Sequence, residues 1–234
     1  MFAGLALRLL QPLVAIGIEA AEPVFEPEPF AARAEAFKAL RMAGLEPHTD
    51  IDLLILIDYD RPSYERRLHV YERGKCPVRS CLVSHGRGSG CANRLFSASF
   101  SNSPGSLATS LGLFRIEGDR PSTKFGRSIE MTGLQPGLNH LAMERMIVIH
   151  PAWYVSYDII CQNIDEENCP RLGESKGCPA LTDDDFAFVL RSIRNVHNVG
   201  GRVFLYAYSG RNGSGEYLKL ASASEVSPSP AGQQ

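Results

Sequence analysis

One cysteine and one histidine of this chain have the types and settings that suit a covalent reaction. Cys178 lies in the stretch Ser175-Lys176-Gly177-Cys178-Pro179-Ala180, and His150 ends the apolar run Met146-Ile147-Val148-Ile149. A cysteine attacks as its thiolate, which is scarce at neutral pH unless a nearby base or a positive local field favours it. The pair therefore predicts acyl transfer through a thioester, with Cys178 as the nucleophile and His150 as its base.

The residues around this pair indicate how it would be held. Gly177 permits a tight turn before the cysteine, and successive N–H groups there, those of Gly177 and Cys178, can face a developing oxyanion. The β-branched run before His150 predicts a buried strand that delivers the imidazole at its end. Spacing alone leaves a structural role open, because free cysteines are often buried and a histidine after a strand is often only hydrogen-bonded.

Several sequence blocks, in order along residues 51–181, make the chain similar to a known family. The blocks are Ser84-His85-Gly86-Arg87-Gly88-Ser89-Gly90, Phe100-Ser101-Asn102-Ser103-Pro104-Gly105-Ser106, Ser110-Leu111-Gly112, Met131-Thr132-Gly133-Leu134, Asn139, Arg145, the run to His150, and Ser175 to Ala180. With them the chain resembles the catalytic domain of murein L,D-transpeptidases, in the branch with the nucleophile motif Ser-x-Gly-Cys-Pro-Ala. It departs from better-known members at Lys176, where they carry a histidine, and at Pro179 and Ala180.

The resemblance implies a fold and a reaction. The fold would hold the L,D-transpeptidase cleft, and Cys178 would attack the carbonyl of the third residue of a murein tetrapeptide stem. Terminal D-alanine would leave, and an amine of a neighbouring stem or water would resolve the thioester. Peptidoglycan stem peptides are then the expected partners, and neither a cofactor nor a metal is implied.

Candidate substrate ligands follow from the negative charge of the donor stem and from the loops of the resembled family. Arg171, Lys176 and Arg145 are the cations that could hold the terminal carboxylate, with ordinary surface charge as the alternative for each. Asn102 lies in the polar loop 96–109, which runs near the active site in the family. His85 ends a strand, as His150 does, and could either line the same cleft or serve as a hydrogen-bonded turn residue.

Three functions remain open at the level of the sequence. The first is transpeptidation. The second uses the same acyl-enzyme but delivers it to water, as an L,D-carboxypeptidase or a hydrolase of murein links. The third is a non-catalytic cell-wall-binding module with an inert Cys178. Acceptor choice depends on the shape of the cleft, which the sequence does not give.

Composition limits the class of protein and its compartment. The 234 residues, 44% of them hydrophobic, suffice for one domain with a proper core. The net charge of −2, without a basic stripe, argues against a nucleic-acid partner. Residues 1–21 are expected to be a signal peptide or an N-terminal hydrophobic helix, which would provide the only membrane contact. We expect an exported monomer in the periplasm or cell envelope.

The six cysteines leave two interpretations of their chemistry. With Cys178 as the nucleophile five remain, and an exported protein could pair Cys161 with Cys169, and Cys81 with either Cys76 or Cys91. Zinc is the competing interpretation, but the chain has no Cys-x-x-Cys pair. We therefore expect no metal site.

Periodicity predicts an α+β fold that is mostly β, a sandwich-like arrangement of strands with a few peripheral helices, and the resemblance implies that it is an L,D-transpeptidase-like β-sandwich. Helices are expected at 30–45 and 182–194, a single helical turn at 139–144, and strands at 51–58, 67–71, 77–83, 111–117, 128–134, 146–150 and 203–208. The domain organisation is a linker at 22–29, the catalytic domain at 30–209 and a flexible tail at 210–234. The glycine-rich turn 86–90 lacks the Lys-Ser/Thr ending of a phosphate-binding loop.

Overall fold

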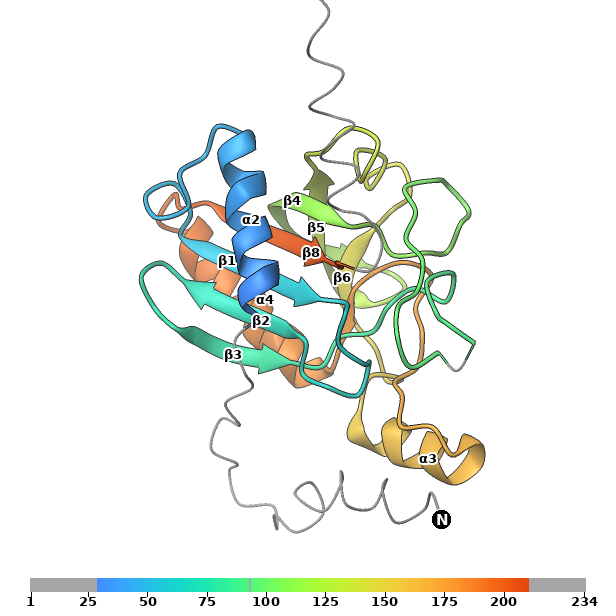
Figure 1. Cartoon of the computed structure of the whole chain (residues 1–234). Helices are drawn as coiled ribbons and strands as arrows, with labels where there is room; N and C mark the ends of the chain where they lie inside the picture. Colours follow the sequence, from blue (N-terminus) through green and yellow to red (C-terminus); the bar gives the residue numbers. More distant parts are fainter. Residues whose placement is uncertain (1–28, 93, 211–234) are drawn as a thin grey trace, which may run out of the picture.

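The computed structural model describes residues 29–92 and 94–210 (Figure 1). Its helices are α2 (Phe30–Met42), α3 (Tyr157–Glu167) and α4 (Asp183–His197), and its strands are β1 (Leu53–Asp58), β2 (Leu68–Glu72), β3 (Pro77–Cys81), β4 (Gly112–Ser122), β5 (Gly126–Gly133), β6 (Val148–Pro151), β7 (Ala180–Leu181) and β8 (Val203–Tyr208). Within these two ranges, no helix has the length and apolar character needed to cross a bilayer. The segments expected at 1–21 and 22–29, apart from Pro29, and at 211–234 lie outside the described residues.

The eight strands form one mixed sheet in the order β3-β2-β1-β8-β4-β5-β6-β7. β1 pairs in parallel with β8, and β6 pairs in parallel with β7, whereas the other neighbours are antiparallel. The prediction of a mostly-β α+β fold is confirmed at this level. The strands join in a single sheet, so the expected β-sandwich is not confirmed.

Two helices cover the two faces of the sheet. Figure 1 shows α2 in front of the strands and α4 behind them. Leu54 and Leu56 of β1 pack with the apolar side of α2, whereas Ile55 and Ile57 of the same strand pack with that of α4. A strand that is buried on both faces reads as a continuous apolar run, as residues 53–57 do.

Local signals explain where the helices begin. The Thr182 hydroxyl accepts a hydrogen bond from the Asp185 N–H at 3.0 Å and thereby caps α4, as predicted. The Ser156 hydroxyl caps α3 in the same way through the Ile159 N–H. Helix α3 was not predicted, because its sequence is polar and it buries only Ile160 and Asn163. The helical turn expected at 139–144 is a series of turns instead.

The β4–β5 hairpin is longer than predicted. Its strands continue beyond the ends expected at residues 117 and 128, and only residues 123–125 separate Ser122 from Gly126. Asp119 of β4 bridges to Arg127 of β5 and to Arg194 of α4. These ion pairs hold the part of the hairpin next to its tip. Because β5 pairs with β6, the hairpin lies beside the strand that carries His150.

Candidate active site

The short strands β6 and β7 bring the two predicted reactive residues together at the edge of the sheet. They pair in parallel with His150 opposite Ala180, and the His150 N–H donates to the Pro179 carbonyl at 3.3 Å. Cys178 lies two residues before Ala180, next to the β6 strand. The histidine on β6 and the cysteine two residues before β7, which are 28 residues apart (178 − 150) in the sequence, therefore have neighbouring backbones.

The immediate surroundings of Cys178 keep its side chain protonated in the resting protein. Burial raises the pKa of the Cys178 thiol, although the Val148 backbone hydrogen bond, Lys124 and Arg145 act to lower it. The thiol donates to the Met146 carbonyl at 3.7 Å. Met146 has a left-handed backbone (φ 55°), which is uncommon for a non-glycine residue and marks the start of the His150 strand as a strained segment. Thiolate formation at neutral pH thus requires a base.

His150 has the tautomer of such a base. Its Nδ1 lies 2.9 Å from the Pro151 carbonyl oxygen, which can only accept a hydrogen bond, so Nδ1 carries the hydrogen and Nε2 keeps a lone pair. Burial lowers the pKa of His150, the Pro151 hydrogen bond raises it, and Lys124 lowers it again. The net lowering leaves the imidazole neutral at pH 7. The Pro151 carbonyl thus orients the ring.

Ser175 and Gly177 shape the turn that presents the nucleophile. The Ser175 hydroxyl accepts from the Gly177 N–H at 3.1 Å and donates to the Cys178 carbonyl at 2.6 Å, which closes the turn on itself. Gly177 has φ +115°, and a Cβ there would lie 2.8 Å from the Ala108 carbonyl oxygen, so only glycine fits. Because Ser175 engages the Gly177 N–H, the Cys178 N–H, which bonds to none of the described residues, is the better placed of the two expected oxyanion donors.

Cys178 opens onto a cleft of about 480 Å³ that carries four cations, Arg120, Lys124, Arg145 and Lys176. Two of them have partners: Arg120 pairs with Glu130 at 2.9 Å, and Arg145 is bonded to the loop described below. Lys124 and Lys176 make no ion pair with any residue of the described ranges and are exposed. These two ammonium groups are therefore available to an anionic substrate, and one of them, Lys124, was not predicted from the sequence.

The guanidinium of Arg145 holds the loop that forms one wall of the cleft. It donates to the Ser101 carbonyl at 2.6 Å, to the Ala108 carbonyl at 2.7 Å, to the Ser106 hydroxyl at 3.2 Å and to the Ser110 hydroxyl. The loop has no secondary structure of its own in this region. Arg145 therefore has a structural task besides the carboxylate binding predicted for it.

Two other predicted substrate ligands do not line the cleft. Arg171 has only 6% of its surface exposed, and its guanidinium bonds to the Glu167 carboxylate and to the Leu172 carbonyl. The Asn102 side chain is half-buried, and it bonds to the His140 ring and accepts from the Leu141 N–H. Neither side chain is among those that surround Cys178 in the cleft.

His85 lies behind the nucleophile turn instead of in the cleft. It is buried, with Nδ1 2.9 Å from the Arg67 guanidinium and Nε2 3.5 Å from the Glu174 carboxylate. Its carbonyl accepts from the Ser175 N–H at 2.9 Å. Burial lowers the pKa of His85, so the ring is a neutral link between a buried cation and a carboxylate. Glu174, directly before the nucleophile motif, was missed by the sequence analysis.

The cysteines other than Cys178 form none of the disulfides that were considered. All six lie in the described ranges and none is cross-linked. Cys76 and Cys81 lie just before and at the end of strand β3 (Pro77–Cys81), and an extended strand of that length holds its ends too far apart for a disulfide. Cys81 is part of the hydrophobic core, where burial strongly raises its pKa. Across the two described ranges, no group of three or more His, Cys, Asp or Glu side chains could hold a metal ion.

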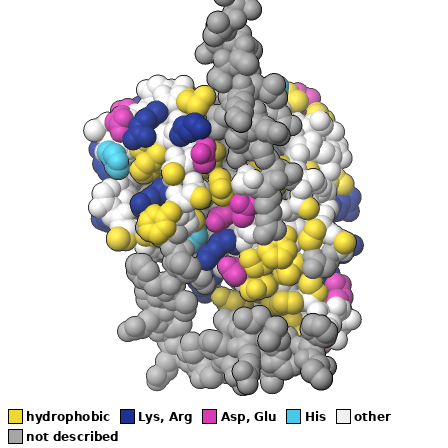
Figure 2. Space-filling view, in the orientation of Figure 1, with side chains coloured by type: hydrophobic (Ala, Val, Ile, Leu, Met, Phe, Trp, Pro, Cys, Tyr) yellow, Lys and Arg dark blue, Asp and Glu magenta, His cyan; other side chains and the backbone are white. Residues whose placement is uncertain are grey.

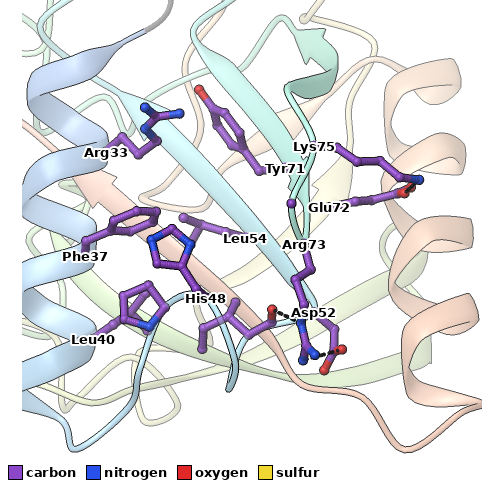
Figure 3. A pocket seen from close by; sticks show the side chains of 13 residues that line it. Arg33, Phe37, Leu40, His48, Asp52, Leu54, Tyr71, Glu72, Arg73 and Lys75 are labelled. Carbon is purple, nitrogen blue, oxygen red and sulfur yellow. Dashed lines mark hydrogen bonds and ion pairs between the residues drawn. The ribbon is translucent and has the colours of Figure 1, made fainter.

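A second pocket lies between α2 and strands β1 and β2, away from Cys178 (Figure 3). Its floor is apolar, with Phe37, Leu40 and Leu54. Charged groups at its rim form ion pairs, Arg73 with Asp52 at 2.7 Å and Lys75 with Glu72 at 2.5 Å. Figure 2 shows that acidic, basic and hydrophobic side chains are interspersed over the described surface of this face. None of the described cysteines lines this pocket, whereas Cys178 lines the other cleft.

Comparison with known proteins gives a family but no near relative. A family model described as "L,D-transpeptidase catalytic domain" matches residues 22–206. No curated protein matches the chain.

Similar solved structures share little sequence with this chain. An L,D-transpeptidase from Mycobacterium smegmatis is 12% identical over 68% of this chain and 59% of its own, with a TM-score of 0.38. An L,D-transpeptidase fragment from Xylanimonas cellulosilytica is 18% identical over 72% and 68%, with a TM-score of 0.32. The helical cell shape determining protein Pgp2 (K307A mutant) from Campylobacter jejuni is 13% identical over 76% and 57%, with a TM-score of 0.42. The chain spans about three fifths of the Mycobacterium structure's length.

Proposed function

Because the chain belongs to the L,D-transpeptidase catalytic domain family, we propose that it is a cysteine-dependent murein L,D-transpeptidase. In this proposal it forms a thioester acyl-enzyme with a tetrapeptide stem and passes the acyl group to an amine of a neighbouring stem. The observation that carries the proposal is the pairing of β6 with β7, which puts the neutral imidazole of His150 on the strand next to Cys178.

The first half of the reaction begins with proton transfer. The thiol of Cys178 turns from the Met146 carbonyl and gives its proton to Nε2 of His150, and the sulfur forms a bond to the carbonyl carbon of the third stem residue. The Cys178 N–H stabilises the oxyanion. The imidazolium returns the proton to the departing amine of D-alanine as the carbon–nitrogen bond breaks. A thioester and a neutral His150 remain.

The second half reverses these roles. The acceptor amine attacks the thioester carbonyl and loses a proton to His150, the carbon–sulfur bond breaks, and the thiolate of Cys178 recovers the proton. Before D-alanine leaves, Lys124 and Lys176 hold its terminal carboxylate, because they are the cleft cations without an ion pair among the described residues. Both ammonium groups also favour the negative charge that develops on sulfur and oxygen.

Intact-protein mass spectrometry after incubation with a carbapenem tests the nucleophile and the base. We expect one adduct in the wild-type protein, no adduct in Cys178→Ala, and slow adduct formation in His150→Ala. Cys161→Ala, which removes an exposed cysteine remote from the cleft, is the matched control and should react like the wild type. A folded, reduced wild-type protein that forms no adduct would contradict the proposal and favour a non-catalytic wall-binding module.

Product analysis with a tetrapeptide stem separates transpeptidation from hydrolysis. With an amine acceptor present, we expect a cross-linked dimer and D-alanine. Release of D-alanine with only tripeptide as the other product, even at high acceptor concentration, would make the protein an L,D-carboxypeptidase with the same site. Since the expected substrate lies in the cell wall, we also propose a periplasmic or cell-envelope location and monomeric action.

A further inference from the structure

The tip of the β4–β5 hairpin lies against the candidate base. Residues 123–125 form the tip, and the Phe125 N–H donates to the Ser122 hydroxyl at 3.2 Å. Gly126 follows with φ +72°, a left-handed conformation that lets β5 begin directly after Phe125. The side chain of Phe125 is thus presented from a short and internally bonded turn.

The ring of Phe125 stacks on the ring of His150. Their centroids are 3.7 Å apart and their planes differ by 13°. His150 has only 3% of its surface exposed, and Phe125 also lines the cleft that contains Cys178. The phenyl ring therefore covers the imidazole and lies at the wall of the cleft where the reaction would occur.

The stack limits the tilt of the imidazole ring, which the hydrogen bond to the Pro151 carbonyl does not prevent. The bond from Nδ1 to the Pro151 carbonyl fixes one point of the imidazole, but the ring can still tilt about that point. A flat aromatic face in contact with the imidazole limits the tilt and fixes the plane in which the Nε2 lone pair lies. Two contacts, one in the plane of the ring and one on its face, orient the base.

The same tip adds to the burial and to the positive field around the imidazole of His150. Stacking keeps water from one face of the imidazole, which contributes to the burial that lowers the pKa of His150. Lys124 is the charged group that faces His150, and its ammonium lies 4.8 Å from the centroid of the Phe125 ring. Both residues of the tip therefore favour the neutral imidazole.

We propose that Phe125 is a positioning residue that holds the imidazole of His150 in the plane needed to accept the Cys178 proton. The proposal rests on the proposed function, in which His150 is the base. Phe125 itself takes no part in bond formation.

The experiment compares the wild type with Phe125→Leu, which removes the aromatic face, and with Phe125→Tyr, which retains it. Two quantities are measured: the rate of carbapenem acylation, and the pH titration of the His150 ring by NMR, with its signals assigned from His150→Ala. We expect Phe125→Leu to slow acylation by about 10- to 100-fold and to move the His150 midpoint up toward its ordinary value. Phe125→Tyr should retain the wild-type rate and midpoint.

Controls separate this role from a general effect on folding. Phe188→Leu changes an aromatic residue of α4 that contacts Arg79 instead of His150, and it should leave both quantities unchanged. If Phe125→Leu does not fold, a nuclear Overhauser contact between the two rings in the wild type provides the test, and its absence overturns the proposal. A folded Phe125→Leu with wild-type acylation and an unmoved midpoint also overturns it. If His150→Ala reacts like the wild type, the proposed function fails instead, whereas the NMR titration still reports on the stack.

Discussion

Replacement of Arg145 by methionine distinguishes a structural arginine from a substrate ligand. The change keeps the unbranched apolar stem but removes the charge and all the donors that hold the 101–110 loop. The Ala108 carbonyl then loses its partner among the described residues, and the Ser101 carbonyl keeps only the bond from the Ser110 hydroxyl. We expect the free energy of unfolding to decrease and the cleft wall to loosen.

The size of the effect follows from the number of contacts and their burial. A hydrogen bond from a charged donor contributes about 1.5–3 kcal/mol, and four bonds made by one group are not additive. Arg145 is only partly buried, so water replaces some of them. We therefore expect a loss of about 2–4 kcal/mol, which corresponds to a decrease in melting temperature of roughly 5–15 °C for a domain of this size.

Urea unfolding followed by circular dichroism measures this loss, with two comparisons. Arg145→Lys keeps the charge but not the planar fork of donors, and should lie between methionine and the wild type. Arg120→Met removes a cleft arginine whose partner Glu130 is solvent-exposed, and should cost less than about 1 kcal/mol. If Arg145→Met unfolds within about 0.5 kcal/mol of the wild type and only substrate affinity falls, the guanidinium binds substrate and our reasoning is refuted.

Three further predictions concern the turn, the cleft charges and the hairpin base. Gly177→Ala should abolish acylation and destabilise the fold by about 2 kcal/mol, measured by mass spectrometry and urea unfolding, because the new Cβ meets the Ala108 carbonyl. Lys124→Met with Lys176→Met should raise KM for a tetrapeptide about tenfold or more while a neutral alkylating agent still modifies the cysteine. The Arg194 guanidinium lowers the pKa of Asp119 to about 2. The stabilisation of the fold by the Asp119 carboxylate, complete above about pH 4, should therefore be lost as the pH falls toward 2. Acid unfolding of Asp119→Asn should lack this loss.

Much of the fold could be predicted because its signals are local. The run from Leu53 to Ile57 is apolar throughout, which indicates a strand covered on both faces, and Thr182 followed by three aspartates indicates a helix start. Helix α3 and strand β7 lacked such signals. The helix has little apolar surface to bury, and a strand of two residues, Ala180–Leu181, shows no period at all.

The candidate site was predictable only where chemistry is tied to a residue type. A cysteine after glycine and a histidine after a strand stand out by themselves, whereas Lys124 and Phe125 belong to a turn whose place in space depends on how β5 pairs with β6. Arg171 lies close to Cys178 in the sequence, yet Glu167, one helical turn before it, pairs with its charge. Proximity along the chain thus did not decide which cation faces the cleft.

Different residues hold the turn that carries Cys178 and contact the imidazole of His150. Ser175, Gly177 and the buried His85 hold the turn from behind, so the position of Cys178 does not depend on substrate. In our proposal the hairpin tip, which lines the cleft, orients the imidazole through Phe125 and supplies positive charge through Lys124. Asp119 anchors the β4–β5 hairpin to α4 independently of its tip. We therefore expect a substitution at the tip to alter reactivity with little effect on the stability of the fold. A substitution behind the nucleophile turn should alter both reactivity and stability.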